Sequence, residues 1–518
     1  MAVSFFKSLY QIELGVSPWL PKGFAALSVS SCTGLERPID REKIIQAVKS
    51  MGNLKAPGKD GYQPIFYKRC WDTVGDSLVN LVEECFREPE LISQVNETLF
   101  VLIPKKEAPE SFLQFRPIGL SNVAYKTLAK CLVNRIKPLM GNLVHPTQTS
   151  FVPGRHISDN IIIVQEVVHS MGLKKGRKGQ MALKIDLTKA YDRLSWNFVK
   201  EVITEIGLPR KFIDAIMACI TSPTMQVLWN GQNTEEFKPS RGLRQGCPLS
   251  PYLFTLCLEK LSHLIRESID QGKWKPIRLN PGGPQLSHIF FADDLILFVE
   301  ASADQAAVIM KCLDTFCQAS GQLVSREKSV VFFAKNTNRT ISSSTTSILG
   351  MPATQDLGRY LGVPVLHGRV TKDTYRYILD RINSKLSGWK AKNLTLGGRV
   401  TLAISVLCSL PIYAMQATLL PISICDEIDK RIRGFIWGST TEARKIHLVH
   451  WEGICRKKED GGLGLRKAHE LNLAYLTKLN WRFLKNPEEL WVQVLQSKYF
   501  KMREGNLRSK TSSRQSNL

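Results

Sequence analysis

The chain lacks any cysteine pair spaced as Cys-x-x-Cys, although 12 cysteines are scattered over its 518 residues. That spacing is typical of zinc sites and redox-active pairs, so the sequence predicts neither. The N-terminal residues MAVSFFKSLYQIELG lack the sustained apolar segment of a secretory signal. We therefore expect reduced thiols and an intracellular protein, with the nucleus and the cytoplasm both open.

Acidic residues are scarce relative to basic ones. The chain has 46 Asp and Glu against 70 Lys and Arg, which gives a net charge of +24. So many like charges repel one another and destabilise a compact fold unless a polyanion binds them. Nucleic acid is the favoured partner, because a duplex carries one charge per about 1.7 Å of its axis. An anionic membrane surface is the second candidate, and a basic surface that is merely solvated is the third.

No apolar run is both long and unbroken enough to define a membrane span. Residues Leu402–Ile424 come nearest, but Pro411 and Pro421 interrupt them, and serines and a threonine lie between. A spanning helix needs about 20 consecutive, mostly apolar residues, and an interior proline breaks the helical hydrogen bonds. We therefore expect two buried helices of a water-soluble domain joined near Pro411, and no membrane contact.

Helical and strand-like segments are mixed without strict β-α-β alternation, which indicates an α+β fold. Residues 1–54 are expected to form a helical leader, and the segment ETLFVLIPKK contains a strand that ends at Pro104. An amphipathic helix should follow a cap at Ser121 or Asn122. The chain beyond residue 359 becomes rich in basic helices. A disordered tail is expected after Lys501, where large apolar residues almost disappear.

The segment HIFFADDLILF places Asp293 and Asp294 between two apolar flanks. The flanks can pair as a β-hairpin in which the two aspartates form the connection. A solvated turn is one interpretation, because aspartate is common in turns. The apolar flanks favour another, in which two carboxylates at a half-buried edge repel each other until a cation joins them. Magnesium suits this role because it binds carboxylate oxygens and leaves positions open for phosphate.

A cation site needs a further ligand from elsewhere in the chain. The stretch ALKIDLTKAYDRL predicts a buried central strand with Asp186 at its exit. Asp192 is the competing candidate, but it falls on the following turn or helix start, where capping explains it. We therefore predict that Asp186 is a metal ligand and that Asp192 is structural.

The loop RGLRQGCPLSP contains Gly242 and Gly246, which permit unusual backbone angles and close approach by a ligand. Ser250 is a suitable helix cap and Pro251 suits the first helical position. The loop therefore leads to a helix N-terminus, which favours an anion, although such loops are common.

Basic side chains precede this region. Lys105 and Lys106 end a strand, and Arg116 follows ten residues later, where it could bind phosphate with two hydrogen bonds. Surface lysines are usually only solvated. Combined with the aspartates and the glycine loop, however, they supply what two-metal phosphoryl transfer requires.

At this point the sequence resembles the reverse transcriptases of non-LTR retrotransposons, the long interspersed element type, and plant copies above all. The order and spacing of the matching stretches hold from about residue 55 to residue 466. They are KAPGKDGY, LIPKK, FRPIGLSNVAYKTLAKCLVNRIKP, QTSFVPGRHISDNI, KIDLTKAYDRLSW, GLRQGCPLSPYLF, FFADDLILF, SREKS, YLGVPV and GGLGLR.

The resemblance implies a right-hand polymerase with fingers, a palm of antiparallel sheet plus helices, and a helical thumb. Fingers and palm would occupy residues 55–358, and the primer grip and basic thumb would occupy residues 359–466. A C-terminal helix and the tail would fill residues 467–518. The implied reaction is RNA-directed DNA synthesis on an RNA template with a DNA primer and deoxynucleoside triphosphates. Two Mg²⁺ ions would serve as cofactors, with Mn²⁺ as a substitute.

The resemblance also assigns roles to residues. Asp186, Asp293 and Asp294 match the catalytic metal-binding triad, and Tyr191 matches the steric gate against ribose. The other matched positions are Lys105 (or Lys106) and Arg116 at the triphosphate, Gln245 and Gly246 in the loop lining the nucleotide and template, and Lys328 as the proton donor to pyrophosphate.

Departures from the family pattern are mild at Gly119 and Ser325. No endonuclease domain and no zinc-binding or RNase H segment is visible, so the sequence resembles a fragment or a decayed copy. A catalytically inactive, maturase-like nucleic-acid binder is the alternative function, and the intact aspartates argue against it. The bulky Tyr191 argues against an RNA-templated RNA polymerase.

Overall fold

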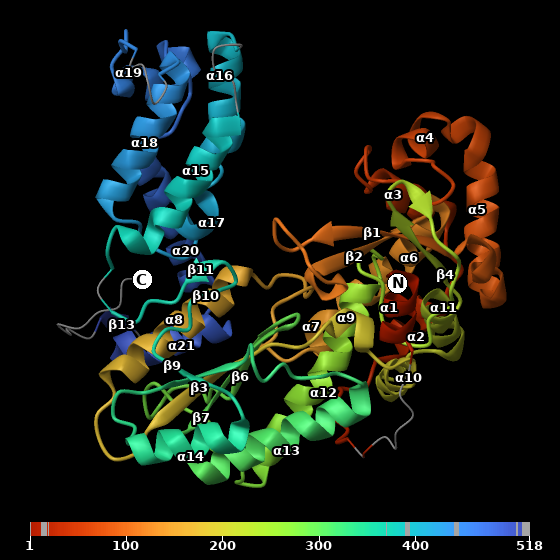
Figure 1. The fold of residues 1–518 in the computed structure, drawn as a ribbon, viewed down its shortest axis with the longest axis horizontal. Coiled ribbons are helices and arrows are strands. Elements are labelled where there is room, and N and C mark those ends of the chain that lie inside the picture. Colours follow the sequence, from red (N-terminus) through yellow and green to blue (C-terminus); the bar gives the residue numbers. More distant parts are fainter. Residues whose placement is uncertain are drawn as a thin grey trace.

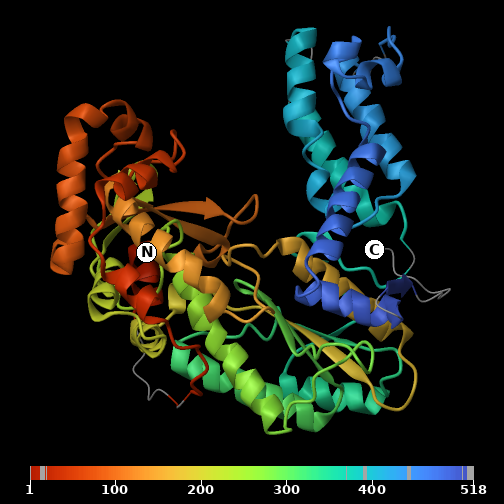
Figure 2. The ribbon, with the colours of Figure 1, turned by 180° about the vertical axis from the view of Figure 1, so that it is seen from behind.

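The computed structural model describes the chain except residues 1, 12–17, 19, 369, 389–393, 440–444, 504–505 and 510–518. It has two upright lobes joined below by a central layer (Figure 1), and the view from behind shows the same separation (Figure 2). The first lobe is built mainly from the N-terminal part of the chain. The second lobe contains the C-terminal helices.

The first lobe, which we call the fingers, surrounds a four-stranded sheet of order β2-β1-β4-β5. Strand β1 pairs antiparallel with β2 and parallel with β4. The strands are β1 (Glu97–Pro104), β2 (Phe115–Ser121), β4 (Thr224–Trp229) and β5 (Gln232–Asn233). The helices are α1 (Ala2–Leu9), α2 (Val29–Glu36), α3 (Arg41–Lys49), α4 (Pro64–Arg69), α5 (Trp71–Arg87), α6 (Val123–Ile136) and α11 (Arg210–Thr221). The predicted strand end at Pro104 is confirmed, as is the predicted helix after Asn122, which is its N-cap residue.

The central layer, the palm, contains a five-stranded sheet of order β6-β7-β3-β8-β9. Its strands are β3 (Gln180–Ile185), β6 (His288–Phe291), β7 (Asp294–Glu300), β8 (Val330–Phe333) and β9 (Ala353–Thr354). The β3 strand is central and pairs antiparallel with both β7 and β8, as the apolar run before Asp186 predicted. The helices around it are α7 (Met140–Leu143), α8 (Ile157–Leu173), α9 (Ala190–Arg193), α10 (Trp196–Glu205), α12 (Ser250–Asp270), α13 (Ala303–Ser320) and α14 (Arg339–Leu349).

Side chains of β3 enter two different hydrophobic cores because neighbouring residues of a strand point to opposite faces. Met181, Leu183 and Ile185 lie in the core that continues into the fingers, whereas Ala182 lies in the core that includes residues of α8. The sheet is therefore covered on both faces, and only its ends are free to carry chemistry.

The second lobe, the thumb, is a helical bundle with its own core. A short hairpin of β10 (Arg359–Tyr360) and β11 (Val363–Pro364), at the predicted primer grip, leads into it. The helices are α15 (Arg376–Gly388), α16 (Leu396–Leu402), α17 (Ile412–Met415), α18 (Ile422–Trp437), α19 (Trp451–Cys455), α20 (Ala468–Lys485) and α21 (Leu490–Tyr499).

The apolar segment at residues 402–424 is broken by its prolines, as predicted. Pro411 is the N-cap residue of α17 and Pro421 that of α18. Within the described residues, no helix combines the length and apolarity needed to cross a bilayer.

The C-terminal tail differs from the expected disorder at residues 501–503 and 506–509. Here β12 (Phe500–Arg503) pairs antiparallel with β13 (Asn506–Ser509). Main-chain hydrogen bonds alone can join two strands, so the scarcity of apolar side chains did not prevent pairing. Residues 510–518 of the expected tail lie outside the described residues.

Candidate active site

The aspartate pair lies at the tip of the β6–β7 hairpin. Phe291 pairs with Asp294, so the two-residue turn consists of Ala292 and Asp293. The prediction that both aspartates form the connection is therefore wrong by one residue, because Asp294 already belongs to β7. Ala292 has φ of 49°, in the left-handed region that tight hairpin turns require of their first central residue.

A strap of polar residues before α8 fixes this hairpin. The Ala292 N–H donates to Ser150 Oγ (2.8 Å), and the Phe290 N–H donates to the Thr147 carbonyl (2.9 Å). From α8 itself, Asn160 Nδ2 donates to the Phe290 carbonyl (2.8 Å). The strap was not recognised from the sequence. Its one signal is that residues 147–150, Thr-Gln-Thr-Ser, are polar although they are buried in the structure.

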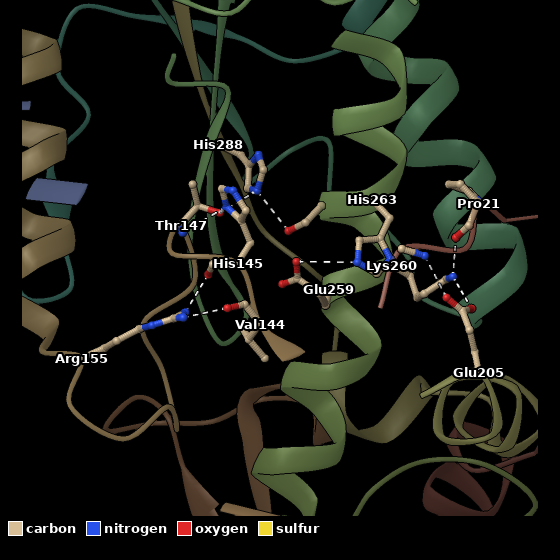
Figure 3. Close-up of polar contacts among 12 residues, drawn as sticks. Pro21, Val144, His145, Thr147, Arg155, Glu205, Glu259, Lys260, His263 and His288 are labelled. Carbon is tan, nitrogen blue, oxygen red and sulfur yellow. Dashed lines mark hydrogen bonds and ion pairs between the residues drawn. The ribbon is translucent and has the colours of Figure 1, made fainter. Parts of the chain in front are cut away.

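Hydrogen bonds of an uncharged histidine hold the base of the same hairpin (Figure 3). His288 on β6 shares hydrogen bonds through Nε2 with Thr147 Oγ1 (2.8 Å) and with Ser262 Oγ of α12 (3.0 Å). Thr147 Oγ1 also contacts His145 Nδ1 (2.9 Å). Burial lowers the pKa of His288 well below its usual value, so the ring stays uncharged. The hairpin is thus attached both to the strap and to α12.

Asp186 follows the last residue of β3, where its main chain is tied to the segment SREKS. Its N–H donates to Ser329 Oγ (3.1 Å), and its carbonyl accepts from the Ser325 N–H (2.8 Å). Ser329 is fully buried and also donates to the Ser325 carbonyl (2.7 Å). The sequence pointed to Lys328 in this segment, but it did not reveal that the two serines fix Asp186.

The three carboxylates lie close enough to repel one another. Partial burial, together with the charge of Asp186, raises the pKa of Asp293, while Arg116 and Lys105 lower it. The pKa of Asp294 is raised by partial burial, by Asp293 and by Asp186. The negative charge of this cluster is therefore incompletely balanced by the protein.

These residues fit a divalent cation by their chemistry. Carboxylate oxygens are the donors that Mg²⁺ prefers, and it commonly takes one or two of them and completes its shell with water and phosphate oxygens. Within the described part of the chain, no group of three or more His, Cys, Asp or Glu side chains is placed to hold a metal ion. The carboxylates would therefore need ligands from substrate to complete the shell of a cation.

Basic side chains face the carboxylates from the fingers and from the SREKS segment. Partial burial lowers the pKa of Lys105, and so do the charges of Lys328 and Arg116, whereas Asp192 and Asp186 raise it. Lys106 instead makes an ion pair with Glu110 (3.2 Å). This geometry favours Lys105 over Lys106 at the site, which the sequence had left open.

The glycine loop is fastened to the fingers by close backbone contact. The Gly119 N–H donates to the Gln245 carbonyl (2.7 Å). Gly246 has φ of 107°, and a Cβ on it would lie 2.7 Å from the Gly119 carbonyl oxygen. Helix α12 begins at Ser250 with Leu249 as N-cap residue, so the predicted cap is one residue too late, while Pro251 is in the first turn as predicted.

Arg244 anchors this loop, although the sequence assigned it no role. It is buried and donates to Asn96 Oδ1 (2.6 Å), Thr98 Oγ1 (2.6 Å) and the Cys219 carbonyl (2.8 Å). An arginine between two glycines of an exposed-looking loop was the available signal. Its position holds Gln245 and Gly246 at the edge of the fingers sheet.

Tyr191 lies on α9, between the core and the aspartates. Its ring stacks on Phe254 of α12, with centroids 4.5 Å apart and an interplanar angle of 14°. Burial raises the pKa of its hydroxyl, and the charge of Asp293 adds to that effect. The ring is therefore half-buried and close to the carboxylate cluster.

Asp192 is buried and contacts the N-terminal segment. Tyr10 donates its hydroxyl to Asp192 Oδ1 (2.8 Å). Burial raises the pKa of Asp192 to about 6, against the effects of Tyr10, Lys189, Lys105 and Gln245. The N-cap residue of α9 is Lys189, so the expectation that Asp192 caps a helix is wrong.

The sheet flanked by two lobes, with acidic residues at its strand ends and basic residues opposite, has the architecture of the right-hand polymerase fold. The family model described as reverse transcriptase (RNA-dependent DNA polymerase) matches residues 103–365. The chain belongs to this family.

Several relatives derive from mobile elements. The chain is 26% identical to the transposon TX1 uncharacterized 149 kDa protein of Xenopus laevis over 84% of this chain and 33% of that protein. It is 26% identical to the retrovirus-related Pol polyprotein from the type-2 retrotransposable element R2DM of Drosophila melanogaster, over 89% of this chain and 44% of that protein.

A plant relative is more similar over a shorter stretch. A putative ribonuclease H protein of Arabidopsis thaliana is 47% identical over 26% of this chain and 22% of that protein. The predicted family, a non-LTR retrotransposon reverse transcriptase, is thereby confirmed. The chain spans less than half the length of these three relatives.

Proposed function

We propose that this chain is an RNA-directed DNA polymerase that adds deoxynucleotides to the 3′-hydroxyl of a DNA primer on an RNA template. The observation that supports this function best is the convergence of Asp186, Asp293 and Asp294 opposite Lys105, Arg116 and Lys328. Acidic and basic groups at the end of one sheet suit a reaction between a hydroxyl and a triphosphate.

In this proposal Asp186, Asp293 and Asp294 would hold Mg²⁺, which would stabilise the charge that develops during phosphoryl transfer. Lys105 and Arg116 would bind the triphosphate oxygens, because cationic donors form strong hydrogen bonds with phosphate. Lys328 would donate a proton to the departing pyrophosphate. Tyr191 would lie beneath the sugar, and Gln245 and Gly246 would line the nucleotide and the template base.

The test is primer extension with Mg²⁺ by Asp293→Asn. The substitution removes one carboxylate from the site, so we expect extension to fall by at least about 100-fold, consistent with loss of several kcal/mol of transition-state stabilisation. The melting temperature should be unchanged or higher, because the raised pKa shows that the ionised carboxyl is unfavourable in the folded state.

The exposed Asp314→Asn on α13 serves as a charge-matched control and should extend primers like the wild type. RNA and DNA templates compared side by side test the template preference. Wild-type extension by Asp293→Asn would refute the site assignment. A wild-type chain that binds RNA but never extends a primer would favour the inactive nucleic-acid binder.

A further inference from the structure

A second basic region lies at the opposite end of the palm from the aspartates. A pocket of ≈ 480 Å³ is lined by Lys174 and Lys178, before β3, and by Lys275 and Arg278, after α12. The six residues of β3 separate it from Asp186. At about 3.3 Å per residue the pocket is about 20 Å from the carboxylates, outside the site described above.

The cations of this region, which we call the distal basic patch, far outnumber the anions. Residues 174–178 read Lys-Lys-Gly-Arg-Lys, and Lys273 adds a further charge. Glu300 is the acidic residue that lines the pocket, and it pairs with Lys178 at 3.8 Å. One carboxylate cannot balance so many cations, so the patch keeps a strong positive potential.

Side-chain amides of a half-buried asparagine and a buried glutamine fix the main chains that carry these cations. Asn336 Nδ2 donates to the carbonyls of Gly176 and Lys178 (both 3.0 Å). Gln305 accepts from the Lys275 N–H (2.8 Å) and donates to the Lys273 carbonyl (2.7 Å). Both loops are thus held in place by their backbones, while the charged side chains of Lys175, Arg177, Lys178 and Lys275 remain exposed.

The patch lacks the features of a site that reads bases. Trp274, the aromatic residue that lines the pocket, is 2% exposed and donates Nε1–H to the Phe298 carbonyl (3.2 Å). Its ring is therefore not available for stacking on a base. Exposed cations without a stacking surface suit the phosphate backbone, whose contacts do not depend on sequence.

We propose that the distal basic patch binds the backbone of the RNA template outside the polymerase cleft. The inference rests on the proposed function, because a template that is not yet copied extends from the active site as a flexible single strand. Such a strand can cover the 20 Å or so between the carboxylates and the patch. The patch would then retain a long template without touching the chemistry.

The test compares two variants with equal loss of charge. One carries Lys174→Gln, Lys178→Gln, Lys275→Gln and Arg278→Gln in the patch. The control carries Lys49→Gln, Lys200→Gln, Lys211→Gln and Lys311→Gln, at exposed positions on other elements. Each protein is titrated with a poly(U) RNA of about 60 nucleotides at several salt concentrations, because counterion release reports the number of phosphate contacts.

We expect the patch variant to bind poly(U) at least about tenfold more weakly than the control. The slope of its log affinity against log salt concentration should be shallower by up to about 3. Both variants should extend a primer equally on a template whose overhang is only a few nucleotides, and both should melt like the wild type. The titration measures RNA binding without DNA synthesis. A patch that does not bind RNA is therefore distinguishable from a chain that does not extend primers.

Three results would overturn the proposal. The first is equal affinity and slope of the two variants for poly(U). The second is a loss confined to duplex DNA, which would make DNA the ligand. The third is a loss of extension on the short template by the patch variant alone, which would place these residues in the catalytic cleft.

Discussion

Tyr191 contacts the core on one side and lies near the carboxylate of Asp293 on the other. Its ring stacks on Phe254, and Asp293 affects its hydroxyl. A ring in this position would collide with a 2′-hydroxyl and pack against deoxyribose, so it would exclude ribonucleotides by clash.

Tyr191→Val should reduce discrimination against ribonucleotides by roughly 10- to 200-fold, corresponding to a clash of about 1–3 kcal/mol. The measurement is the ratio of kcat/KM for a deoxynucleotide and its ribonucleotide. Tyr191→Phe keeps the ring and should keep the ratio. If Tyr191→Val leaves the ratio of the two kcat/KM values unchanged, Tyr191 serves only to pack on Phe254.

Asp192 gives a prediction for stability rather than activity. Its pKa is raised from 3.8 to about 6, so the folded state favours the protonated carboxyl. The stability that this group contributes is fully present below about pH 4 and is lost as pH rises through 6. A shift of two units corresponds to about 3 kcal/mol in the free energy of unfolding.

Asp192→Asn should therefore gain stability relative to wild type between pH 4 and pH 7, by up to about 3 kcal/mol. Denaturant unfolding at a series of pH values measures the difference. The exposed Asp314→Asn should show no comparable trend. A constant difference between Asp192→Asn and wild type over this range would show that Asp192 ionises normally.

At the residue scale, the charged groups of the site could be recognised from the sequence, whereas the polar residues that fix their main chains could not. Asp293 was recognisable because a carboxylate inside an apolar run needs an explanation. Ser150 and Ser329 were not, because each bonds a main chain more than 140 residues away. Local patterns contain no information on such partners, and serine is common in any loop.

At the scale of elements, strands β1 and β3 and the β6–β7 hairpin follow from their apolar patterns. The hairpin turn was misplaced by one residue because alanine is an unusual residue at positive φ, and two aspartates match turn statistics better. The prolines at 411 and 421 marked helix starts correctly, since each lacks the N–H that a helix interior needs.

Palm and thumb are joined by an ion-pair cluster whose centre is Arg482 of α20. Arg482 donates to both oxygens of Asp159 on α8 (3.0 and 3.2 Å) and to Glu489 (2.7 Å). The arginine and Asp159 are largely buried, with side chains 15% and 9% exposed. Loss of the arginine would leave two carboxylates facing each other at this junction.

Arg482→Met should lower the free energy of unfolding by about 3 kcal/mol, in the range found when one partner of a buried pair is removed. It should also shorten the products made per binding event, because the thumb is then held less firmly on α8, where Lys498 and Tyr499 still bond Glu166. Lys485→Met, on the same helix, is the control. Equal stability of the two variants would show that the cluster does not hold the lobes together.

At the scale of the whole molecule, the net charge of +24 predicts a strong dependence of nucleic-acid binding on salt. The slope of log affinity against log salt should be about −0.9 for each phosphate neutralised on a duplex. Fluorescence anisotropy with a template–primer from 50 to 200 mM salt measures it. A nearly flat response would favour a basic surface that is only solvated.

Gly246 has a φ of 107°, and a Cβ on it would lie 2.7 Å from the Gly119 carbonyl oxygen. A Cβ on Gly119 would meet Thr98 Cγ2 at 3.1 Å and the Gln245 carbonyl oxygen at 3.3 Å, contacts that a shift of a few tenths of an ångström relieves. Among copies of this sequence, those under selection should therefore retain Gly246, whereas position 119 can accept another small residue. Loss of Gly246 would thus mark a copy that is no longer under selection before any frameshift or stop codon appears.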